Sequence, residues 1–259
     1  MADDLIFEVK GRVGWATFNR PAQRNALTFG MYEGLAALCD RLAASREVGA
    51  LVIRGAGEQA FAAGTDIAQF RDFRSGEDGI AYERKMDRIL DTIERCPIPT
   101  IAAIAGACTG GGAAIAAVCD LRLAAPNARF GFPIARTLGN CLSMSNYTRL
   151  AALVGPQRTK EMIFLATLVD GPTARDIGLV GEVLTDPAAL WSRAQRLGEE
   201  VAGHAPITLA VTKEALRRLQ AGDAASGIDD LIRRTYGSAD FREGMDAFLG
   251  KRAPVWKGA

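Results

Sequence analysis

Short strand-like segments alternate with amphipathic helical segments up to Pro187, and this alternation constrains the fold more than any other feature of the sequence. The runs 5–10 and 13–19 predict a β-hairpin, and Thr28 is placed to cap the helix that follows. The order strand, strand, helix then recurs at a spacing of roughly 45 to 50 residues, as a repeat of topology rather than of sequence. We therefore expect an α/β core with a helical appendage.

Apolar runs and helical periodicity predict the other elements. The predicted strands are 50–54, 100–105, 120–124, 128–132 and 182–184, and the predicted helices are 77–95, an alanine-rich segment ending at Cys119, 143–153, 157–165 and 172–177. From Pro187 onward the sequence predicts only amphipathic helices.

Composition excludes several classes of protein. The 259 residues include 31 Lys and Arg against 30 Asp and Glu, a balance that argues against nucleic-acid and membrane-surface binding. No apolar run reaches the roughly 18 residues that a membrane span needs. The acidic start, residues 1–4, predicts no secretory signal. The five cysteines form no C-x-x-C pair, so we expect free thiols, a cytoplasmic location and no metal site.

Two loops of small residues follow predicted strands and are the candidate binding elements. The glycine triplet 110–112 opens a helix, whose first N–H groups lack internal partners and carry partial positive charge. Taken alone, the triplet is equally consistent with a tight strand-to-helix turn. The loop 61–66 has little side-chain bulk, and we expect Asp66 to cap the next helix. Together the loops could supply two N–H groups to one carbonyl oxygen, the minimum for an oxyanion hole.

Two other features are weaker candidates. The segment 55–60 fits G-x-G-x-x-A, but it continues as a loop where a dinucleotide site needs a helix, so a dinucleotide oxidoreductase is the least favoured alternative. His204, the only histidine, lies between two helical patterns, and we expect it at a helix end or on the surface. No G-x-S-x-G segment supplies a nucleophilic serine.

A set of short motifs occurs in a distinctive order. They are Asn19-Arg20-Pro21, Asn25-Ala26-Leu27, 61–67, 99–112, Cys119-Asp120, and 242–245 with Phe248 and Lys251-Arg252. The ordered set resembles the enoyl-CoA hydratase/isomerase family, or crotonase superfamily, over nearly the whole chain. The resemblance implies a crotonase-like α/β spiral of ββα units over 1–195, which carries the acyl-CoA site, and a C-terminal helical trimerisation region over 196–259.

The resemblance also implies partners and site residues. The expected partner is an acyl-CoA thioester, with no cofactor beyond the coenzyme A of the substrate, and the expected assembly is a homotrimer or a dimer of trimers. The amides of Thr65 and Gly111 would form the oxyanion hole and stabilise a thioester enolate. The residues implied at the CoA site are Gln23, Arg24, Ala26, Ala62, Ala63, Asp66, Ile67 and Lys251. Lys251 would reach a CoA phosphate from a neighbouring subunit, or would simply be a solvated surface charge.

The chain departs from the family pattern at two positions. Hydratases of the family use two glutamates, and the matching positions here hold Ala114 and Ile134, which cannot transfer protons. The other residues expected in the substrate pocket are Arg136, Asn140 and Cys141. Arg136 is suited to holding an acidic acyl group by a bidentate contact. For Cys141 we favour packing over chemistry.

Three acidic residues lie where the family often covers its pocket, so one of them is a candidate to enter it: Asp72, Glu77 and Glu83. The leading hypothesis is an acyl-CoA enzyme that stabilises a thioester enolate. Isomerisation, decarboxylation and thioester hydrolysis remain open as its reaction, and a CoA-thioester binding protein with little catalysis is the alternative from another class.

Overall fold

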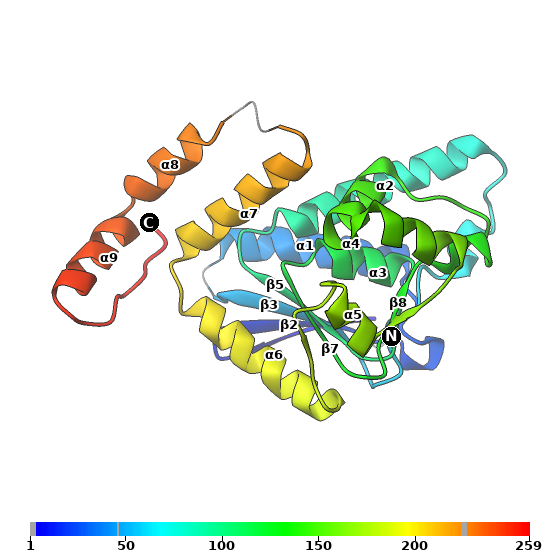
Figure 1. Ribbon diagram of the computed structural model, residues 1–259, viewed down its shortest axis with the longest axis horizontal. Helices are drawn as coiled ribbons and strands as arrows, with labels where there is room; N and C mark the ends of the chain where they lie inside the picture. Colours follow the sequence, from blue (N-terminus) through cyan, green and yellow to red (C-terminus); the bar gives the residue numbers. More distant parts are fainter. Residues whose placement is uncertain (1–3, 46, 224–226) are drawn as a thin grey trace.

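The computed structural model describes residues 4–45, 47–223 and 227–259, so residues 1–3 at the predicted acidic start lie outside it. The strands are β1 (Leu5–Lys10), β2 (Val13–Phe18), β3 (Ala50–Gly55), β4 (Ala60–Ala62), β5 (Thr100–Ile104), β6 (Ala107–Thr109), β7 (Leu121–Ala124), β8 (Arg129–Gly131), β9 (Val169–Asp170) and β10 (Glu182–Val183). The α-helices are α1 (Phe29–Ala44), α2 (Gly76–Glu94), α3 (Gly111–Val118), α4 (Met144–Phe164), α5 (Gly171–Asp176), α6 (Pro187–Ala202), α7 (Pro206–Gln220), α8 (Asp229–Tyr236) and α9 (Ala239–Leu249) (Figure 1). Short 3₁₀ helices are η1 (Pro21–Gln23), η2 (Ile67–Phe70) and η3 (Pro133–Ala135).

The strands form two sheets, and the chain alternates between them. The larger sheet has the order β1-β2-β3-β5-β7-β10, and the smaller has the order β4-β6-β8-β9. In three successive units the first strand joins the larger sheet, the second joins the smaller, and a helix follows: β3-β4-α2, β5-β6-α3 and β7-β8-α4. The predicted repeat of strand, strand, helix is therefore confirmed, and the predicted hairpin is the antiparallel pair β1–β2.

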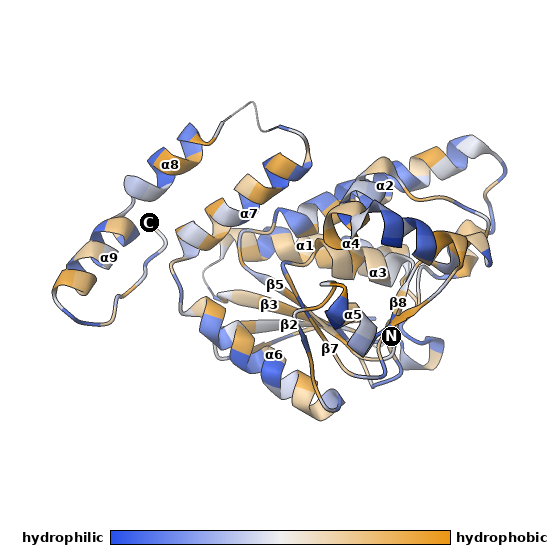
Figure 2. Ribbon diagram, in the orientation of Figure 1, coloured by the Kyte–Doolittle hydropathy of each residue, from blue (hydrophilic) through white to orange (hydrophobic). Residues whose placement is uncertain are grey.

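The larger sheet is covered on both faces, which explains why most side chains of its inner strands are apolar. Because side chains alternate along a strand, Leu51 and Ile53 of β3 pack with α1, α2 and α3, whereas Val52 packs with Leu190 and Ala194 of α6. Figure 1 shows α6 on one side of the sheet and α1 and α3 on the other. In Figure 2 the hydrophobic colours run along β2, β3, β5 and β7, between these layers.

Some elements differ from the sequence-based expectation. The predicted loop 61–66 begins inside β4, and the short strands β4, β6 and β9 were not predicted. The two helices predicted at 143–153 and 157–165 form the single element α4, with a break at Gly155, whose φ is 80° and ψ is 158°. After Gly55 the chain enters β4 without starting a helix, so the context that a dinucleotide fingerprint needs is missing.

The C-terminal helices α7, α8 and α9 extend away from the sheets (Figure 1). Lys213 of α7 ties them to the core, because its ammonium group lies 2.7 Å from a carboxylate oxygen of Asp120. The division predicted at 195/196 falls inside α6, whose buried residues include Ala194 before it and Ala202 after it. In the described part of the chain, no helix is both long and apolar enough to span a bilayer.

Candidate active site

A cavity of about 280 Å³ lies where the two predicted small-residue loops meet. Its walls come from α1, the loop after β4, α2, the start of α3, and the segment from Phe132 to Leu142. Most of the lining side chains are apolar or aromatic. The cavity therefore suits an apolar group whose polar end faces the loops.

The loop after β4 is held so that the amide of Thr65 finds no acceptor in the described part of the chain. Leu27 donates its N–H to the carbonyl of Gly64 at 2.8 Å and accepts the N–H of Asp66 at 2.9 Å. These bonds form a parallel bridge between Leu27 and Thr65, in which the N–H of Thr65 itself points away from Leu27. Gly64 has a φ of 107°, a conformation that favours glycine.

The glycine triplet presents a second amide, that of Gly111, for which the described ranges offer no acceptor. Gly110 has φ 51° and ψ −117°, which glycine adopts most easily, and donates its N–H to the carbonyl of Gly131 at 3.0 Å. Gly111 is the first residue of α3, where backbone N–H groups have no acceptor within the helix. Ala114 bonds back to the carbonyl of Gly110 at 2.9 Å, which fixes this first turn.

The two loops lie in contact. A Cβ atom built on Gly110 would lie 3.6 Å from the Cα of Gly64, and one built on Gly111 would lie 3.0 Å from Oγ1 of Thr65. The amides of Thr65 and Gly111 have no acceptor among the described residues, and both residues line the cavity. A ligand oxygen that enters between the loops therefore has two unpaired donors close by.

Two tyrosines fix the position of Thr65. The Thr65 hydroxyl lies 2.9 Å from Oη of Tyr32 on α1 and 3.0 Å from Oη of Tyr82 on α2. Burial raises the pKa of Tyr32 and of Tyr82, so both phenols stay neutral. Sequence analysis missed both tyrosines, because nothing local in the sequence marks a helix residue that reaches a distant loop.

Of the three acidic residues considered from the sequence, Glu83 is the one that lines the cavity. Burial, together with the nearby carboxylate of Asp87, raises the pKa of Glu83 to about 7, although a hydrogen bond from the backbone of Ser143 partly opposes this rise. Among the described residues that line the cavity, Glu83 is the only one with a carboxyl, amine, guanidinium, imidazole or thiol group.

The residues predicted in the substrate pocket divide into two groups. Ala114, Ile134 and Asn140 line the cavity. Arg136 and Cys141 are exposed and are not part of its lining. The four other cysteines are buried, and all five are free thiols.

The predicted CoA residues on the first loop lie beside the cavity. Ala63 and Ile67 line it, and Ala62 is buried in β4 directly before them. Asp66 caps η2 by accepting the N–H of Ala68, as predicted. The bond from Ala68 and, to a smaller extent, a hydrogen bond from the side chain of Arg20 lower the pKa of Asp66.

The remaining predicted CoA residues lie farther out. Gln23 and Arg24, at the end of η1, have exposed side chains, and Ala26, which follows two residues later, is half-buried. The carbonyl of Arg24 accepts the N–H of Ala63 at 3.0 Å, which places this segment beside the cavity loop. Lys251 follows α9 in the sequence. Figure 1 shows α9 at the far end of the C-terminal helices, away from α3.

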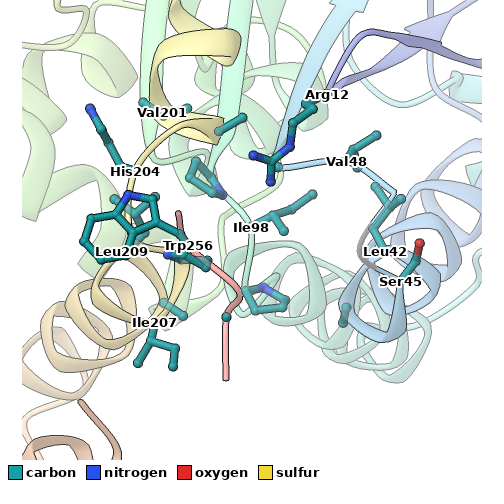
Figure 3. Close-up of a pocket in the computed structure, with 18 of the residues that line it drawn as sticks. Arg12, Leu42, Ser45, Val48, Ile98, Val201, His204, Ile207, Leu209 and Trp256 are labelled. Atoms are coloured by element: carbon teal, nitrogen blue, oxygen red, sulfur yellow. The ribbon is translucent and has the colours of Figure 1, made fainter. Parts of the chain in front are cut away.

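A second cavity, of about 300 Å³, lies beside the C-terminal tail (Figure 3). Arg12, His204 and Trp256 line it together with apolar side chains, and Gly49 and Pro99 place it at the amino-terminal ends of β3 and β5. Ligand sites of parallel sheets lie beyond the opposite, carboxyl ends, where the paired loops are. His204 is exposed between α6 and α7, at a helix end as predicted. No cluster of metal-ligating side chains occurs within the described ranges.

Comparison with known proteins identifies the family of this chain. The family model described as Enoyl-CoA hydratase/isomerase matches residues 8–259. The chain is 31% identical to the Short-chain-enoyl-CoA hydratase of Clostridium acetobutylicum over 96% of each chain, and 31% identical to the mitochondrial Methylglutaconyl-CoA hydratase of Mus musculus over 93% of this chain and 78% of that one. The crystal structure of an enoyl-CoA hydratase/carnithine racemase from Magnetospirillum magneticum superposes with a TM-score of 0.91 at 32% identity, covering 100% of this chain and 97% of the other. The spiral of ββα units and a match that runs almost from end to end establish that the chain belongs to the enoyl-CoA hydratase/isomerase family, the crotonase superfamily.

Proposed function

We propose that this protein binds an acyl-CoA thioester and stabilises the enolate of that thioester with the backbone amides of Thr65 and Gly111. The observation that carries the proposal is the meeting of two loops, each with an unpaired amide, at one cavity. The thioester oxygen gains negative charge as an enolate forms, so fixed donors at that oxygen bind the transition state more tightly than the substrate. The apolar lining suits the acyl chain.

The cavity argues against the usual two-glutamate hydration. Ala114 and Ile134 occupy the positions where family hydratases carry their glutamates, and neither can position water or donate a proton. Each missing acid–base group corresponds to about 10²–10⁴ in rate. We therefore propose enolate chemistry of another kind within the family, such as isomerisation, decarboxylation or thioester hydrolysis. Hydration of crotonyl-CoA at the rate of an ordinary hydratase would contradict this proposal.

We assign the coenzyme A portion to the rim formed by η1 and the loop after β4. The contact between Arg24 and Ala63 supports this assignment, because it leaves an exposed basic side chain beside the cavity. Lys251 would contribute from a neighbouring subunit. The C-terminal helices expose apolar side chains, including Phe248 at 85% and Leu249 at 76%, which supports a trimer or a dimer of trimers. Native mass spectrometry that finds only monomer would contradict the assembly.

The experiment that tests the function uses acetoacetyl-CoA, whose enolate is measured by its ultraviolet absorbance. Binding to the oxyanion hole is expected to raise the enolate fraction at fixed pH. The same donors are expected to lower the infrared frequency of a ¹³C-labelled thioester carbonyl, a measurement that needs no variant. Bound acetoacetyl-CoA with an unchanged enolate fraction and a carbonyl band as in water would contradict catalysis and favour the CoA-thioester binding protein.

A matched pair of variants isolates one donor. Gly111→Pro removes the N–H at the first helical position, where proline is tolerated, whereas Gly111→Ala keeps it. Both new side chains place a Cβ 1.7 Å from Oη of Tyr32, so both are made in a Tyr32→Phe background. After circular dichroism shows equal folding, the proline variant is expected to lose about 10²–10³ in enolate stabilisation relative to the alanine variant. Equal values would contradict the assignment of Gly111.

A further inference from the structure

The family match leaves open how a proton is moved, because both usual glutamate positions are apolar. The cavity nevertheless contains one group suited to the task. Glu83 lies on α2, a different helix from Ala114, yet both residues line the same cavity. Within the described lining, every other side chain is apolar, a neutral amide, or a hydroxyl of high pKa. The cavity thus contains a carboxyl, but this group enters from α2 rather than from the positions of Ala114 and Ile134.

The surroundings of Glu83 favour a carboxyl that exchanges its proton near neutral pH. Asp87, one turn further along α2, is the nearby charge, and its carboxylate accepts the Ser143 hydroxyl at 2.7 Å. The backbone of Ser143, the residue that caps the start of α4, donates a hydrogen bond to Glu83. Tyr82 of α2 and Tyr32 of α1 are the other titratable groups that interact with it, and both are neutral phenols. No described lining residue is a cation, so nothing in the cavity fixes Glu83 in its charged form.

We propose that Glu83 is the acid–base residue of this site and transfers the α-proton of the bound thioester. The inference rests on the proposed function. The Glu83 carboxylate takes the proton as the α-carbon–hydrogen bond breaks, and the electron pair of that bond moves into the enolate, whose oxygen the amides of Thr65 and Gly111 hold. The carboxyl then returns the proton to carbon. With one such group in the cavity, the expected substrate class is acyl-CoA thioesters with an acidic α-hydrogen, and the expected chemistry is a proton shift.

The test follows the exchange of α-hydrogens of butanoyl-CoA with D₂O by NMR. Glu83→Gln keeps the shape and a hydrogen-bonding group but cannot transfer a proton, so exchange is expected to fall by about 10²–10⁴. The affinity for butanoyl-CoA, measured by calorimetry, is expected to change less than about twofold, because the amides and the apolar wall are intact. Glu77→Gln is the matched control, because Glu77 is exposed on the first turn of the same helix. The rate of α-hydrogen exchange in this variant is expected to equal that of the unaltered protein.

A pH profile separates proton transfer from a merely structural role. Exchange in the unaltered protein is expected to rise with pH through a midpoint near 7, because the charged carboxylate is the base. Burial is the larger cause of the raised pKa of Glu83 and the Asp87 carboxylate is the second, so Asp87→Asn is expected to move the midpoint to lower pH without returning it to the ordinary value. Glu83→Asp keeps a carboxyl on a shorter side chain, so its exchange is expected to be slower but still to rise with pH through a midpoint.

The possible results separate the role of Glu83 from the proposed oxyanion hole. Exchange in Glu83→Gln within twofold of the unaltered protein overturns the role of Glu83 and leaves the oxyanion hole standing. A polarised thioester carbonyl without any α-hydrogen exchange in the unaltered protein also overturns the role of Glu83 alone. Failure to bind acyl-CoA, or binding with an unpolarised carbonyl, overturns the proposed function and this inference with it.

Discussion

The close approach of Tyr32 to Gly111 gives a prediction that the structure makes quantitative. A methyl group on Gly111 would lie 1.7 Å from Oη and 3.0 Å from Cζ of Tyr32, where ordinary contacts are about 3.5–4.0 Å. Tyr32 is 1% exposed, so the ring cannot move into solvent. Gly111→Ala must therefore overpack the site, which typically costs about 1–3 kcal/mol. Displacement of the phenol also breaks its hydrogen bond to Thr65, at about 1 kcal/mol.

Removing the Tyr32 hydroxyl relieves most of this conflict. Tyr32→Phe alone is expected to cost about 1 kcal/mol, because Thr65 keeps its bond to Tyr82. In that background Gly111→Ala no longer meets Oη, and its cost is expected to fall to about 1 kcal/mol. A double-mutant cycle should therefore give a coupling of about 1–3 kcal/mol, with the double variant more stable than the sum of the single changes implies.

Urea unfolding at a single protein concentration measures the cycle, since any assembly makes apparent stability depend on concentration. The four proteins are compared by their midpoints and slopes, and the ligand is left out so that only packing is tested. Additive costs, with a coupling below about 0.5 kcal/mol, would refute the placement of the Tyr32 hydroxyl against Gly111 and thus the geometry of the candidate oxyanion hole.

Three further predictions concern stability. Burial in the folded state raises the pKa of Glu83 from its ordinary 4.5 to about 7, so the protonated carboxyl favours folding. The free energy of unfolding, measured relative to Glu83→Gln, should be highest below about pH 4.5 and should fall as the pH rises through about 7. A difference between the two proteins that stays constant from about pH 4.5 to about 7 would contradict this prediction. Arg149→Met should lower the free energy of unfolding by roughly 2 kcal/mol, because buried Arg149 joins α4 to Glu94 of α2 at 2.7 Å. Its second partner, Asp91, is only half-buried and adds little. An unchanged midpoint of urea unfolding would refute the contribution of the pair between Arg149 and Glu94. Gly112→Ala should cost more than Gly111→Ala, because its methyl group would lie 2.3 Å from the backbone oxygen of Ala62, and Tyr32→Phe should not rescue it; rescue would show that the two glycines share one neighbour.

Much of the fold follows from local chemistry that the sequence displays. Short runs rich in apolar residues predict the strands β1, β2, β3, β5 and β7, and Thr28 before a periodic apolar stripe predicts α1. The strands β4, β6 and β9 have two or three residues each, too few to carry a periodic signal, and they exist because neighbouring strands pair with them. In the second sheet, β8 coincides with the predicted strand 128–132, whereas β4, β6 and β9 depend on their strand partners.

The candidate site divides in the same way. The small-residue loops were visible because glycine at Gly64 and Gly110 permits conformations that other residues avoid. The tyrosine clamp on Thr65 and the position of Glu83 were not visible, because both depend on how α1 and α2 pack against loops far away in the sequence. Sequence reasoning could narrow the acidic candidates to three but could not choose among them, and it placed Arg136 and Cys141 in a pocket whose lining excludes them in the structure.

The most direct test of the central claim is a crystal structure with a bound non-reactive acyl-CoA. The account predicts that the thioester oxygen lies within hydrogen-bond distance, about 2.7–3.2 Å, of the amide nitrogens of both Thr65 and Gly111. A thioester oxygen beyond the reach of either amide, or a ligand seated in the cavity beside Trp256, would contradict it.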